Sequence, residues 1–246
     1  MSEGRRPVCA VIGAGDGLGG AIAGAFAREG LAVALTRRPR HLADLEALAE
    51  RIRADGGEAH AFGIDARDED EVRRLFETIE TKIGPLEVLV FNIGANVRFP
   101  LIETTGRVYS KVWEMAAFAG FLAGREAART MAERGKGTIL FTGATASVRG
   151  AADFSAFAGA KHALRALGQS MARELGPKGV HVAHIVIDGA IDGAFIRSIM
   201  PDAAEKRERQ EILIPEDIAA NYVWLHRQPR SAWTFEMDVR PWAETW

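Results

Sequence analysis

Cysteine is almost absent from this chain. Cys9 is the only one among 246 residues, and it lies within the apolar run Pro7–Ile12. A single thiol excludes an internal disulfide and a cluster of thiolate metal ligands, so we interpret Cys9 as a buried strand residue. Disulfide frameworks are typical of oxidising compartments, and their absence favours a reducing one. The beginning of the chain, Met1–Arg6, is polar, so we expect no apolar signal segment and a cytoplasmic location.

Charge of one sign and long apolar runs are also lacking. Lys and Arg number 31 against 33 Asp and Glu, which gives a formal net charge of −2. A basic excess is the electrostatic footprint of nucleic-acid binding, so its absence argues against that class of partner. No apolar run reaches the roughly 18 residues that a membrane-spanning helix needs. Histidine and cysteine show no metal-binding spacing. We therefore expect no metal ion, no nucleic acid and no membrane as a partner.

Short apolar runs alternate along the chain with longer stretches of helical periodicity, without an internal repeat, low-complexity tract or linker. Seven strands are predicted, at Val8–Ile12, Leu31–Thr36, Ala59–Ile64, Leu86–Asn92, Thr138–Thr142, Val180–Ile187 and Thr234–Val239. The predicted helices are Gly17–Glu29, His41–Ala54, Asp68–Ile83, Val108–Glu133, Ser155–Leu175 and Pro215–Arg227.

This alternation is typical of a doubly wound α/β fold. Strands that are joined by helices run parallel, and the helices cover both faces of the sheet. The length and the 48% hydrophobic content fit one domain with a sizeable core. We therefore predict a single three-layer αβα domain over residues 1–246, with a parallel seven-stranded sheet. Residues 188–214 are less regular, and we expect them to form loops over a substrate cleft.

A glycine-rich turn, Gly13-Ala14-Gly15-Asp16-Gly17-Leu18-Gly19, follows the first strand and opens the first helix. Glycine lets a backbone approach a pyrophosphate closely, and a helix N-terminus favours its negative charge. The alternative is a tight strand-to-helix turn without a ligand. Because the turn stands between a strand and a helix, we favour dinucleotide binding. The expected contacts are six residues of the turn: Gly13, Gly15, Asp16, Gly17, Leu18 and Gly19.

The end of the second strand discriminates between two dinucleotides. An acid at this place would bond the ribose 2′-hydroxyl of NAD, whereas this chain has Thr36-Arg37-Arg38. A guanidinium can pair with the 2′-phosphate of NADP. Ordinary loop arginines are the alternative, and Asp16 argues mildly against a nearby phosphate. We favour NADP as the cofactor, with NAD as the second choice.

The glycines at 13, 17 and 19, together with Lys161, resemble the short-chain dehydrogenase/reductase family. The family hallmark is Tyr-x-x-x-Lys, in which the tyrosine hydroxyl acts as acid or base beside the nicotinamide. This chain has Phe157-Ala158-Gly159-Ala160-Lys161, so a phenylalanine stands in the tyrosine position. A positioned general acid contributes about 10²–10⁴ in rate, and Phe157 has no proton to give. The resemblance implies a Rossmann-type fold and a nicotinamide cofactor.

The resemblance also implies roles at the ends of later strands. Asp65 resembles the acid that contacts the adenine amine, and Asn92-Ile93-Gly94 resembles the family's Asn-Ala-Gly signature. After the sixth strand, Asp188-Gly189 replaces the family's Pro-Gly, and Gly193 replaces a threonine that touches the carboxamide. The alternative is that these are turn residues, since Asp and Asn often close strands. Their place at successive strand ends favours cofactor binding by Asp65, Asn92, Gly94, Asp188 and Gly189.

Three of the family's four catalytic positions hold apolar residues. The helix pattern puts the asparagine position at Ala116, and the family's usual spacing before Phe157 puts the serine position at Ala144. Only Lys161 remains, and the family gives it a second role, in which its ammonium bonds the ribose hydroxyls. A solvated helix lysine is the alternative for Lys161.

Polar residues near these positions leave other proton donors open. The nearest hydroxyls to Ala144 are those of Thr142, Thr145 and Ser147. Asp188 and Asp192 lie where the reactive ring is expected, and a carboxylate there could act as a base. We favour the plainer interpretation, in which both aspartates bond loop amides.

Two functional hypotheses follow. The first is an NADP-dependent oxidoreductase with an unknown small-molecule substrate, in which water, a substrate group or Asp192 manages the proton. The second is a nucleotide-binding sensor or partner subunit without turnover. The combination of Phe157, a retained Lys161 and the ending Pro229–Trp242 resembles a branch of the family with an incomplete site.

Two further features concern packing between chains. The helices around Val108–Met131 and Phe157–Leu175 are rich in small residues, and in the family the corresponding helices join subunits. We therefore expect a homodimer or a homotetramer. The aromatic residues near the end of the chain, Trp233, Phe235, Trp242 and Trp246, are expected to pack on the body or on a neighbouring subunit.

Overall fold

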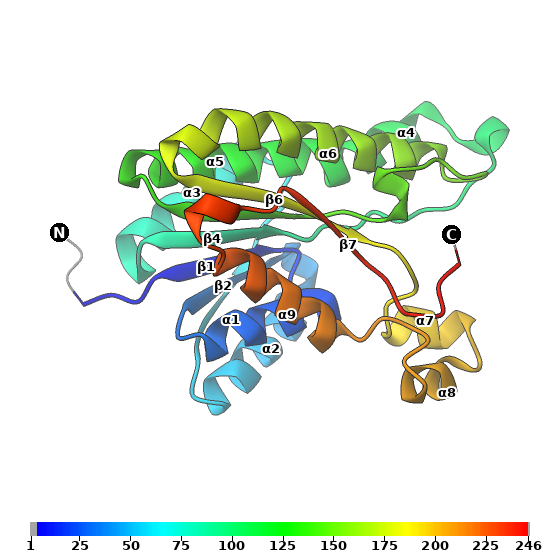
Figure 1. The fold of residues 1–246 in the computed structure, drawn as a ribbon, viewed down its shortest axis with the longest axis horizontal. Helices are drawn as coiled ribbons and strands as arrows, with labels where there is room; N and C mark the ends of the chain where they lie inside the picture. The colour runs from blue at the N-terminus through cyan, green and yellow to red at the C-terminus, as the bar shows by residue number, and fades with distance from the viewer. Residues whose placement is uncertain (1–3, 246) are drawn as a thin grey trace.

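The computed structural model describes residues 4–245. The first three residues of the polar start and the final Trp246 lie outside the described residues. The seven predicted strands form one parallel sheet in the order β3-β2-β1-β4-β5-β6-β7 (Figure 1). The strands are β1 (Val8–Ile12), β2 (Ala32–Arg37), β3 (Glu58–Gly63), β4 (Leu86–Phe91), β5 (Gly137–Thr142), β6 (Val180–Ile187) and β7 (Glu236–Val239). The predicted doubly wound seven-stranded sheet is confirmed.

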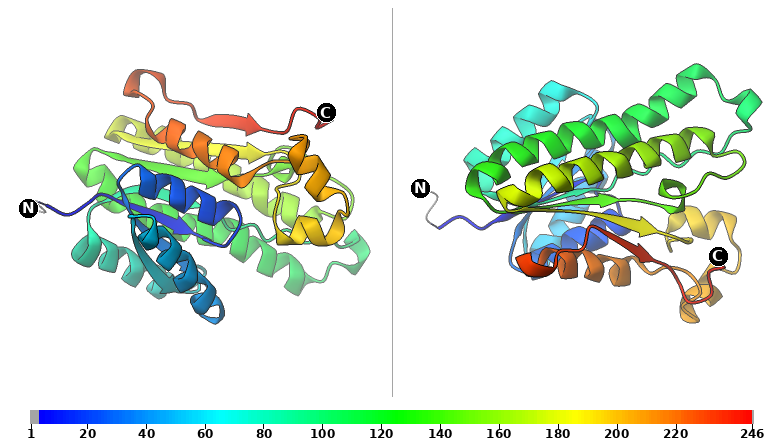
Figure 2. Two further views of the ribbon diagram at one scale, coloured as in Figure 1. Left: turned by 90° about the horizontal axis from the view of Figure 1, so that it is seen from below. Right: turned by 45° about the horizontal axis from the view of Figure 1, so that its top comes forward.

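Helices cover both faces of this sheet, which makes the predicted three layers. One layer holds α1 (Leu18–Arg28), α2 (Leu42–Ala54) and α9 (Pro215–His226). The other holds α3 (Glu69–Thr78), α4 (Gly106–Trp113), α5 (Ala119–Arg134) and α6 (Ser155–Leu175). Figure 2 shows α4, α5 and α6 together on one face, with β7 at the edge of the sheet. Among residues 4–245, no helix is long and apolar enough to cross a membrane.

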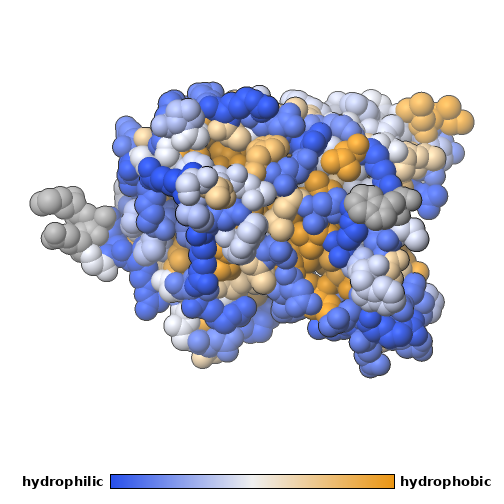
Figure 3. Space-filling view, viewed as in Figure 1, coloured by the Kyte–Doolittle hydropathy of each residue, from blue (hydrophilic) through white to orange (hydrophobic). Residues whose placement is uncertain are grey.

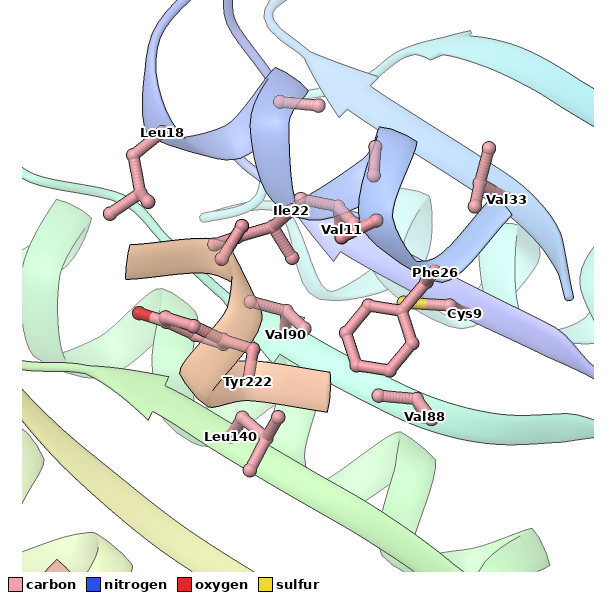
Figure 4. Close-up of a cluster of buried hydrophobic side chains, with 14 of the residues drawn as sticks. Cys9, Val11, Leu18, Ile22, Phe26, Val33, Val88, Val90, Leu140 and Tyr222 are labelled. Carbon is pink, nitrogen blue, oxygen red and sulfur yellow. The ribbon is translucent and has the colours of Figure 1, made fainter. Parts of the chain in front are cut away.

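The central strands are apolar because both of their faces are covered. All five residues of β1 and all eight of β6 are buried, as expected for strands in a parallel sheet. Cys9 of β1 is fully buried beside Phe26 of α1, as Figure 4 shows, and burial raises the pKa of its thiol. The interpretation of Cys9 as a buried strand residue is confirmed.

The structure differs from the sequence expectation in two segments. The helix predicted over Val108–Glu133 is divided into α4 and α5 by one wide π-helical turn, Glu114–Phe118. Such turns insert a residue into a helix and shift the faces of the two halves. In the irregular region 188–214, the chain forms two short helices, α7 (Ala194–Ile199) and α8 (Ala203–Glu208). Both lie at the end of the sheet to which the strands point (Figure 1).

The aromatic residues near the end of the chain pack unequally. Trp233 stacks on His181, with ring centroids 4.9 Å apart. Trp242 is 74% exposed, although its indole N–H donates to the Arg209 carbonyl at 3.2 Å. The expectation of packing on the body is therefore met by Trp233, whereas most of the Trp242 ring is exposed in the single chain and its packing on a neighbouring subunit stays a prediction.

Candidate functional site

The glycine-rich turn lies at the carboxyl edge of the sheet, against the end of β4. Gly13 has φ +98°, a conformation that favours glycine, and its carbonyl accepts a hydrogen bond from the Asn92 side chain at 3.1 Å. A Cβ on Gly19 would lie 2.5 Å from the Gly13 carbonyl oxygen and 3.0 Å from the Asn92 amide nitrogen. The first turn of α1 therefore rests directly on the turn and on the end of β4, which only glycine at position 19 permits.

The other glycines of the turn leave its outer side open. Nothing lies within 4 Å of a Cβ on Gly17, and only the Arg37 guanidinium lies near a Cβ on Gly15, at 3.7 Å. Their small size therefore answers no packing need of the protein. The Asp16 carboxylate pairs with Arg51 at 3.2 Å, which partly offsets its negative charge at the turn. The Leu18 side chain lies in the core (Figure 4), so only its main chain could face a ligand.

A cleft of about 330 Å³ opens beside the turn, between the ends of β1, β2, β3 and β4. Its walls include Gly13, Gly15, Arg37, Arg38, Asp65, Asn92 and Gly94, all predicted from the sequence, and also His41, Arg67 and Met115, which were not. The cleft thus brings together residues that four strand ends supply. This is the position at which open α/β sheets bind ligands.

Basic groups dominate the outer part of this cleft. Arg67 binds both carboxylate oxygens of Asp65, at 2.5 and 2.9 Å, and this hydrogen bonding lowers the pKa of Asp65. Arg37 pairs with Asp44 at 3.7 Å. The Arg38 guanidinium lies 3.6 Å from the Met115 sulfur, and its charge helps to lower the pKa of Asp65. Of these three arginines, Arg38 is the one that forms no ion pair within residues 4–245. Arg67 lies two residues after Asp65, so its place at the cleft could have been predicted from that spacing.

Lys161 is buried in the middle of the site. Its side chain comes from α6, is 2% exposed, and donates to the carbonyl oxygens of Ile93 at 3.1 Å and Thr142 at 2.9 Å. Ile93 follows β4, and Thr142 ends β5, so the ammonium joins two neighbouring strand ends. Burial lowers the pKa of Lys161 to about 8. The alternative of a solvated helix lysine is wrong.

The three apolar residues at the usual catalytic positions lie together. Ala116 and Phe157 belong to one buried cluster with Val112, Ala156 and Ala160, and the partly buried Ala144 packs against it. The π-helical turn carries Ala116 into this cluster. The Lys161 ammonium lies 5.9 Å from the centroid of the Phe157 ring, within the range of a cation–π contact. The structure thus brings together in one apolar cluster the three residues that the resemblance assigns to catalytic positions.

The hydroxyls nearest to Ala144 are all engaged. Thr142 bonds the Tyr222 hydroxyl at 2.7 Å on the far side of the sheet, and Ser147 accepts from the Ala144 amide at 3.1 Å. Thr145 donates to the Asp188 carboxylate. Of the three, Thr145 is the one bonded to a residue of the expected nicotinamide end.

The two aspartates after β6 are held by arginines. Asp188 lies 3.8 Å from Arg149 and 3.5 Å from Arg240, and Asp192 accepts two hydrogen bonds from Arg197, both at 2.8 Å. Arg197 and then Arg207 lower the pKa of Asp192 to about 2, against a cost of burial. A carboxylate with such a pKa is a poor base at neutral pH. Asp192 therefore has a structural role, but its carboxylate accepts hydrogen bonds from the guanidinium groups of Arg197 and Arg207 and not from the loop amides that we expected.

The end of the chain passes over the same region. Gly189 has φ +146°, and a Cβ there would lie 2.9 Å from Pro241. Gly193 is extended and starts α7. Within residues 4–245, no group of three or more His, Cys, Asp or Glu side chains lies close enough together to hold a metal ion.

Comparison with known proteins gives the same architecture. The model of the short chain dehydrogenase family matches residues 7–202. A short-chain dehydrogenase of known structure from Rhodopseudomonas palustris is 48% identical, with a TM-score of 0.83, over 97% of this chain and 100% of that one. The 3-oxoacyl-[acyl-carrier-protein] reductase MabA of Mycobacterium avium is 31% identical over 77% of this chain and 69% of its own length. A metagenomic short-chain oxidoreductase in complex with NADP is 26% identical, with a TM-score of 0.78, over 96% of both chains.

Proposed function

Because the chain belongs to the short-chain dehydrogenase/reductase family, we propose that it binds NADP in the cleft and acts as an oxidoreductase without the tyrosine relay. The observation that carries the proposal is the open outer side of the glycine-rich turn 13–19, which could serve as a pyrophosphate cradle. Gly13 and Gly19 close the turn against β4, while Gly15 and Gly17 leave its outer side bare for a pyrophosphate. A nicotinamide, when bound, supplies the hydride chemistry itself.

The basic outer part of the cleft supports NADP over NAD. Arg37 ends β2 and Arg38 follows it, where a 2′-phosphate of the adenine ribose would lie. Two acids lie near these arginines: Asp44, 3.7 Å from Arg37, and Asp65, which is already paired with Arg67. Asn92 holds the turn through Gly13 and lines the same cleft. NAD remains the second choice, since the pyrophosphate cradle serves both.

At the reactive end, the residues of this chain position a ligand without offering it the usual proton. An ammonium has three donors, and Lys161 uses two of them on the carbonyls of Ile93 and Thr142, which leaves one for a ribose hydroxyl. Phe157 and Ala144 exclude water from one side. The Thr145–Asp188 pair, next to Ala144 in the sequence, is a polar group that could orient a reacting oxygen. The proton would then come from water, from the substrate or through Thr145.

One observation favours a second candidate, a dinucleotide-binding protein without turnover. Ala116 and Phe157 are buried in one apolar cluster and Ala144 packs against it, so all three of these relay positions would lack a polar group. With or without turnover, the Lys161 ammonium joins the chain after β4 to the end of β5. A sensor or partner subunit would retain the cradle and Lys161 and would have no need of the hydroxyls.

Titration of NADPH and NADH by nicotinamide fluorescence tests the shared part of both candidates. We expect saturable binding that is tighter for NADPH, and the lack of binding of either nucleotide would refute both. A panel of carbonyl and enoyl compounds then separates them, since turnover of any panel member supports the oxidoreductase. The double variant Phe157→Tyr with Ala144→Ser restores two relay hydroxyls, and we expect it to raise carbonyl reduction by about 10²-fold or more. Phe154→Tyr, outside the three catalytic positions, is the matched control.

We also propose a cytoplasmic homodimer or homotetramer, joined through the layer of α4, α5 and α6. Its support is a row of half-exposed aromatic rings, in which Trp113 stacks on Phe118 at 6.1 Å and Phe118 on Phe121 at 6.3 Å, with Arg125 over the last ring. Trp113 is 43% exposed and Phe121 is 40% exposed in the single chain. A monomer mass in light scattering at micromolar concentration would refute this assembly. Trp113→Ser with Phe121→Ser is expected to shift a dimer toward monomer.

A further inference from the structure

A second cavity, of about 170 Å³, opens at the edge of the sheet where the strands begin, opposite to the cofactor cleft. Its walls include Glu87 of β4, Thr138 of β5 and His181 of β6, each of which is the second residue of its strand. The segment before β7, red in Figure 1, also lines this cavity and lies at the end of the sheet away from α7 and α8. The surface at this end of the molecule is mostly hydrophilic (Figure 3). The cavity is therefore polar and separate from the cofactor cleft.

The segment from Gln228 to Thr234 forms one wall of the cavity, and its own hydrogen bonds hold its shape. The Gln228 side chain donates to the Thr234 hydroxyl and accepts from the Thr234 amide, both at 2.8 Å. The Trp233 indole donates to the Gln228 carbonyl at 3.3 Å, and its ring stacks on His181 with the ring centroids 4.9 Å apart. This wall is therefore formed before any ligand binds.

Basic side chains outnumber acidic ones among the residues that line the cavity. Lys136 and Arg230 are the cations, and Glu87 is the acid. Lys136 lies 2.9 Å from Glu87. Arg230 donates to the Gly135 carbonyl at 2.6 Å and forms no ion pair within residues 4–245. Two cations thus face one carboxylate, and an anion bound between them would meet the positive charge that is left over.

His181 adds a hydrogen-bond acceptor that the protein leaves unused. It is 3% exposed, and its Nε2 lies 2.8 Å from the Thr234 carbonyl oxygen. Burial lowers the pKa of His181, which favours the neutral ring, and because a carbonyl can only accept, Nε2 carries the proton. Nδ1 is then a buried acceptor to which no group of the described part of the chain donates. Buried polar atoms rarely lack a partner, so Nδ1 indicates that a donor binds here.

We propose that this cavity binds a small oxyanion that also carries a hydroxyl group, either a hydroxycarboxylate or hydrogen phosphate. The oxyanion lies between the Lys136 ammonium and the Arg230 guanidinium, and its hydroxyl donates to Nδ1 of His181. Two charge-assisted hydrogen bonds and one neutral hydrogen bond are enough for a Kd of about 1 mM or below. The site lies outside the cofactor cleft, so it does not depend on the proposed function.

Calorimetric titration at low ionic strength tests the class of ligand, since salt screens exposed charges. Glycolate and inorganic phosphate are expected to bind with a Kd of about 1 mM or below, and binding of only one of them identifies the oxyanion that the cavity takes. Acetate lacks the hydroxyl and is expected to bind about 3- to 10-fold more weakly than glycolate. Neutral glycolamide is expected to bind at least about 10-fold more weakly. A Kd above about 10 mM for both anions, or acetate or glycolamide that binds as tightly as glycolate, would overturn the proposal.

Variants locate the bound anion. Lys136→Gln with Arg230→Gln removes both cations and is expected to weaken the binding of glycolate and phosphate about 10-fold or more. Lys82→Gln with Arg74→Gln changes the net charge equally at exposed positions outside the cavity and is expected to leave binding unchanged. Each single variant, Lys136→Gln or Arg230→Gln, is expected to weaken binding about 3-fold, which keeps the test decisive if the double variant does not fold.

The same anions could enter the glycine-rich turn of the cofactor cleft, so one more variant separates the two sites. Arg37→Ala with Arg38→Ala changes the cofactor cleft and is expected to leave the binding of glycolate and phosphate unchanged. If anion binding is lost in this variant and kept in Lys136→Gln with Arg230→Gln, the anion lies in the cofactor cleft and the proposal is wrong. NADPH titration of the same proteins reports on the proposed function separately, because its failure would leave the anion data at the other edge of the sheet unaffected.

Discussion

The close contact between α1 and the glycine-rich turn makes a sharp prediction about Gly19. In Gly19→Ala, the new Cβ would lie 2.5 Å from the Gly13 carbonyl oxygen, 2.9 Å from the Ala14 Cα and 3.0 Å from the Asn92 amide nitrogen. The first two of these atoms are backbone and cannot swing aside. The start of α1 or the turn must therefore move by several tenths of an ångström, and the Asn92–Gly13 hydrogen bond lies in the path of that movement.

The expected loss of stability follows from two opposing terms. Overpacking of this kind costs about 1–3 kcal/mol, and alanine regains at most about 1 kcal/mol through its better helix propensity. A net loss of about 1–2 kcal/mol remains. For a domain of this size it lowers the Tm by about 2–8 °C. Because the displaced turn is also the pyrophosphate cradle, the Kd for NADPH is expected to rise about 10-fold or more.

Gly24→Ala in the same helix is the matched control. Its Cβ would meet only the end of the flexible Arg28 side chain, at 3.4 Å, so no overpacking cost opposes the gain in helix propensity. The Tm of Gly24→Ala is therefore expected to rise slightly. Thermal unfolding monitored by circular dichroism and NADPH titration give both quantities for both variants. If Gly19→Ala and Gly24→Ala shift the Tm in the same direction and leave the Kd equal, the close contact is not what requires glycine at position 19.

Two further predictions concern charge. Burial lowers the pKa of His184 to about 4, whereas its unfolded value is near 6.5, so the unfolded chain binds the extra proton as the pH falls between these values. The free energy of unfolding is therefore expected to decrease by up to about 3 kcal/mol from pH 6.5 to pH 4. Urea unfolding at a series of pH values measures this decrease, which should be smaller in His184→Asn. An equal decrease in that variant would show that other groups cause the loss. Arg37→Ala with Arg38→Ala is expected to weaken NADPH binding about 10- to 100-fold and NADH binding by less than about 3-fold, and an equal loss for both nucleotides would refute the 2′-phosphate assignment.

Local sequence patterns predicted the parts of the site that depend on short segments. The glycine-rich turn is specified by its place between a strand and a helix, and Asp65 and Asn92 lie within two residues of the ends of β3 and β4. Such residues meet at one edge because parallel strands all end there. The spacing to Lys161 likewise identified Phe157 and Ala144 as the residues that occupy the tyrosine and serine positions of the family pattern.

Contacts between distant segments could not be predicted in the same way. The burial of Lys161 depends on Ile93, which lies 68 residues away, and on the register of α6 against two strands. The pairing of Asp192 with Arg207 needs α8 to fold back over α7, and periodicity does not report such a turn. The exposure of Trp242 depends on the path of the chain end across Gly189. Each of these is a tertiary arrangement for which the local sequence carries no preference.

The two hydrogen bonds of the Lys161 ammonium have a consequence for comparisons among relatives. They tie the chain after β4 to the end of β5. Even in a relative without catalytic activity, replacement of this lysine would therefore disturb the shape of the cofactor cleft. A lysine at this position therefore reports that the cleft is assembled, and it does not report that a reaction takes place there. Among chains that lack the tyrosine, catalytic competence has to be judged from the polar groups around the bound ring.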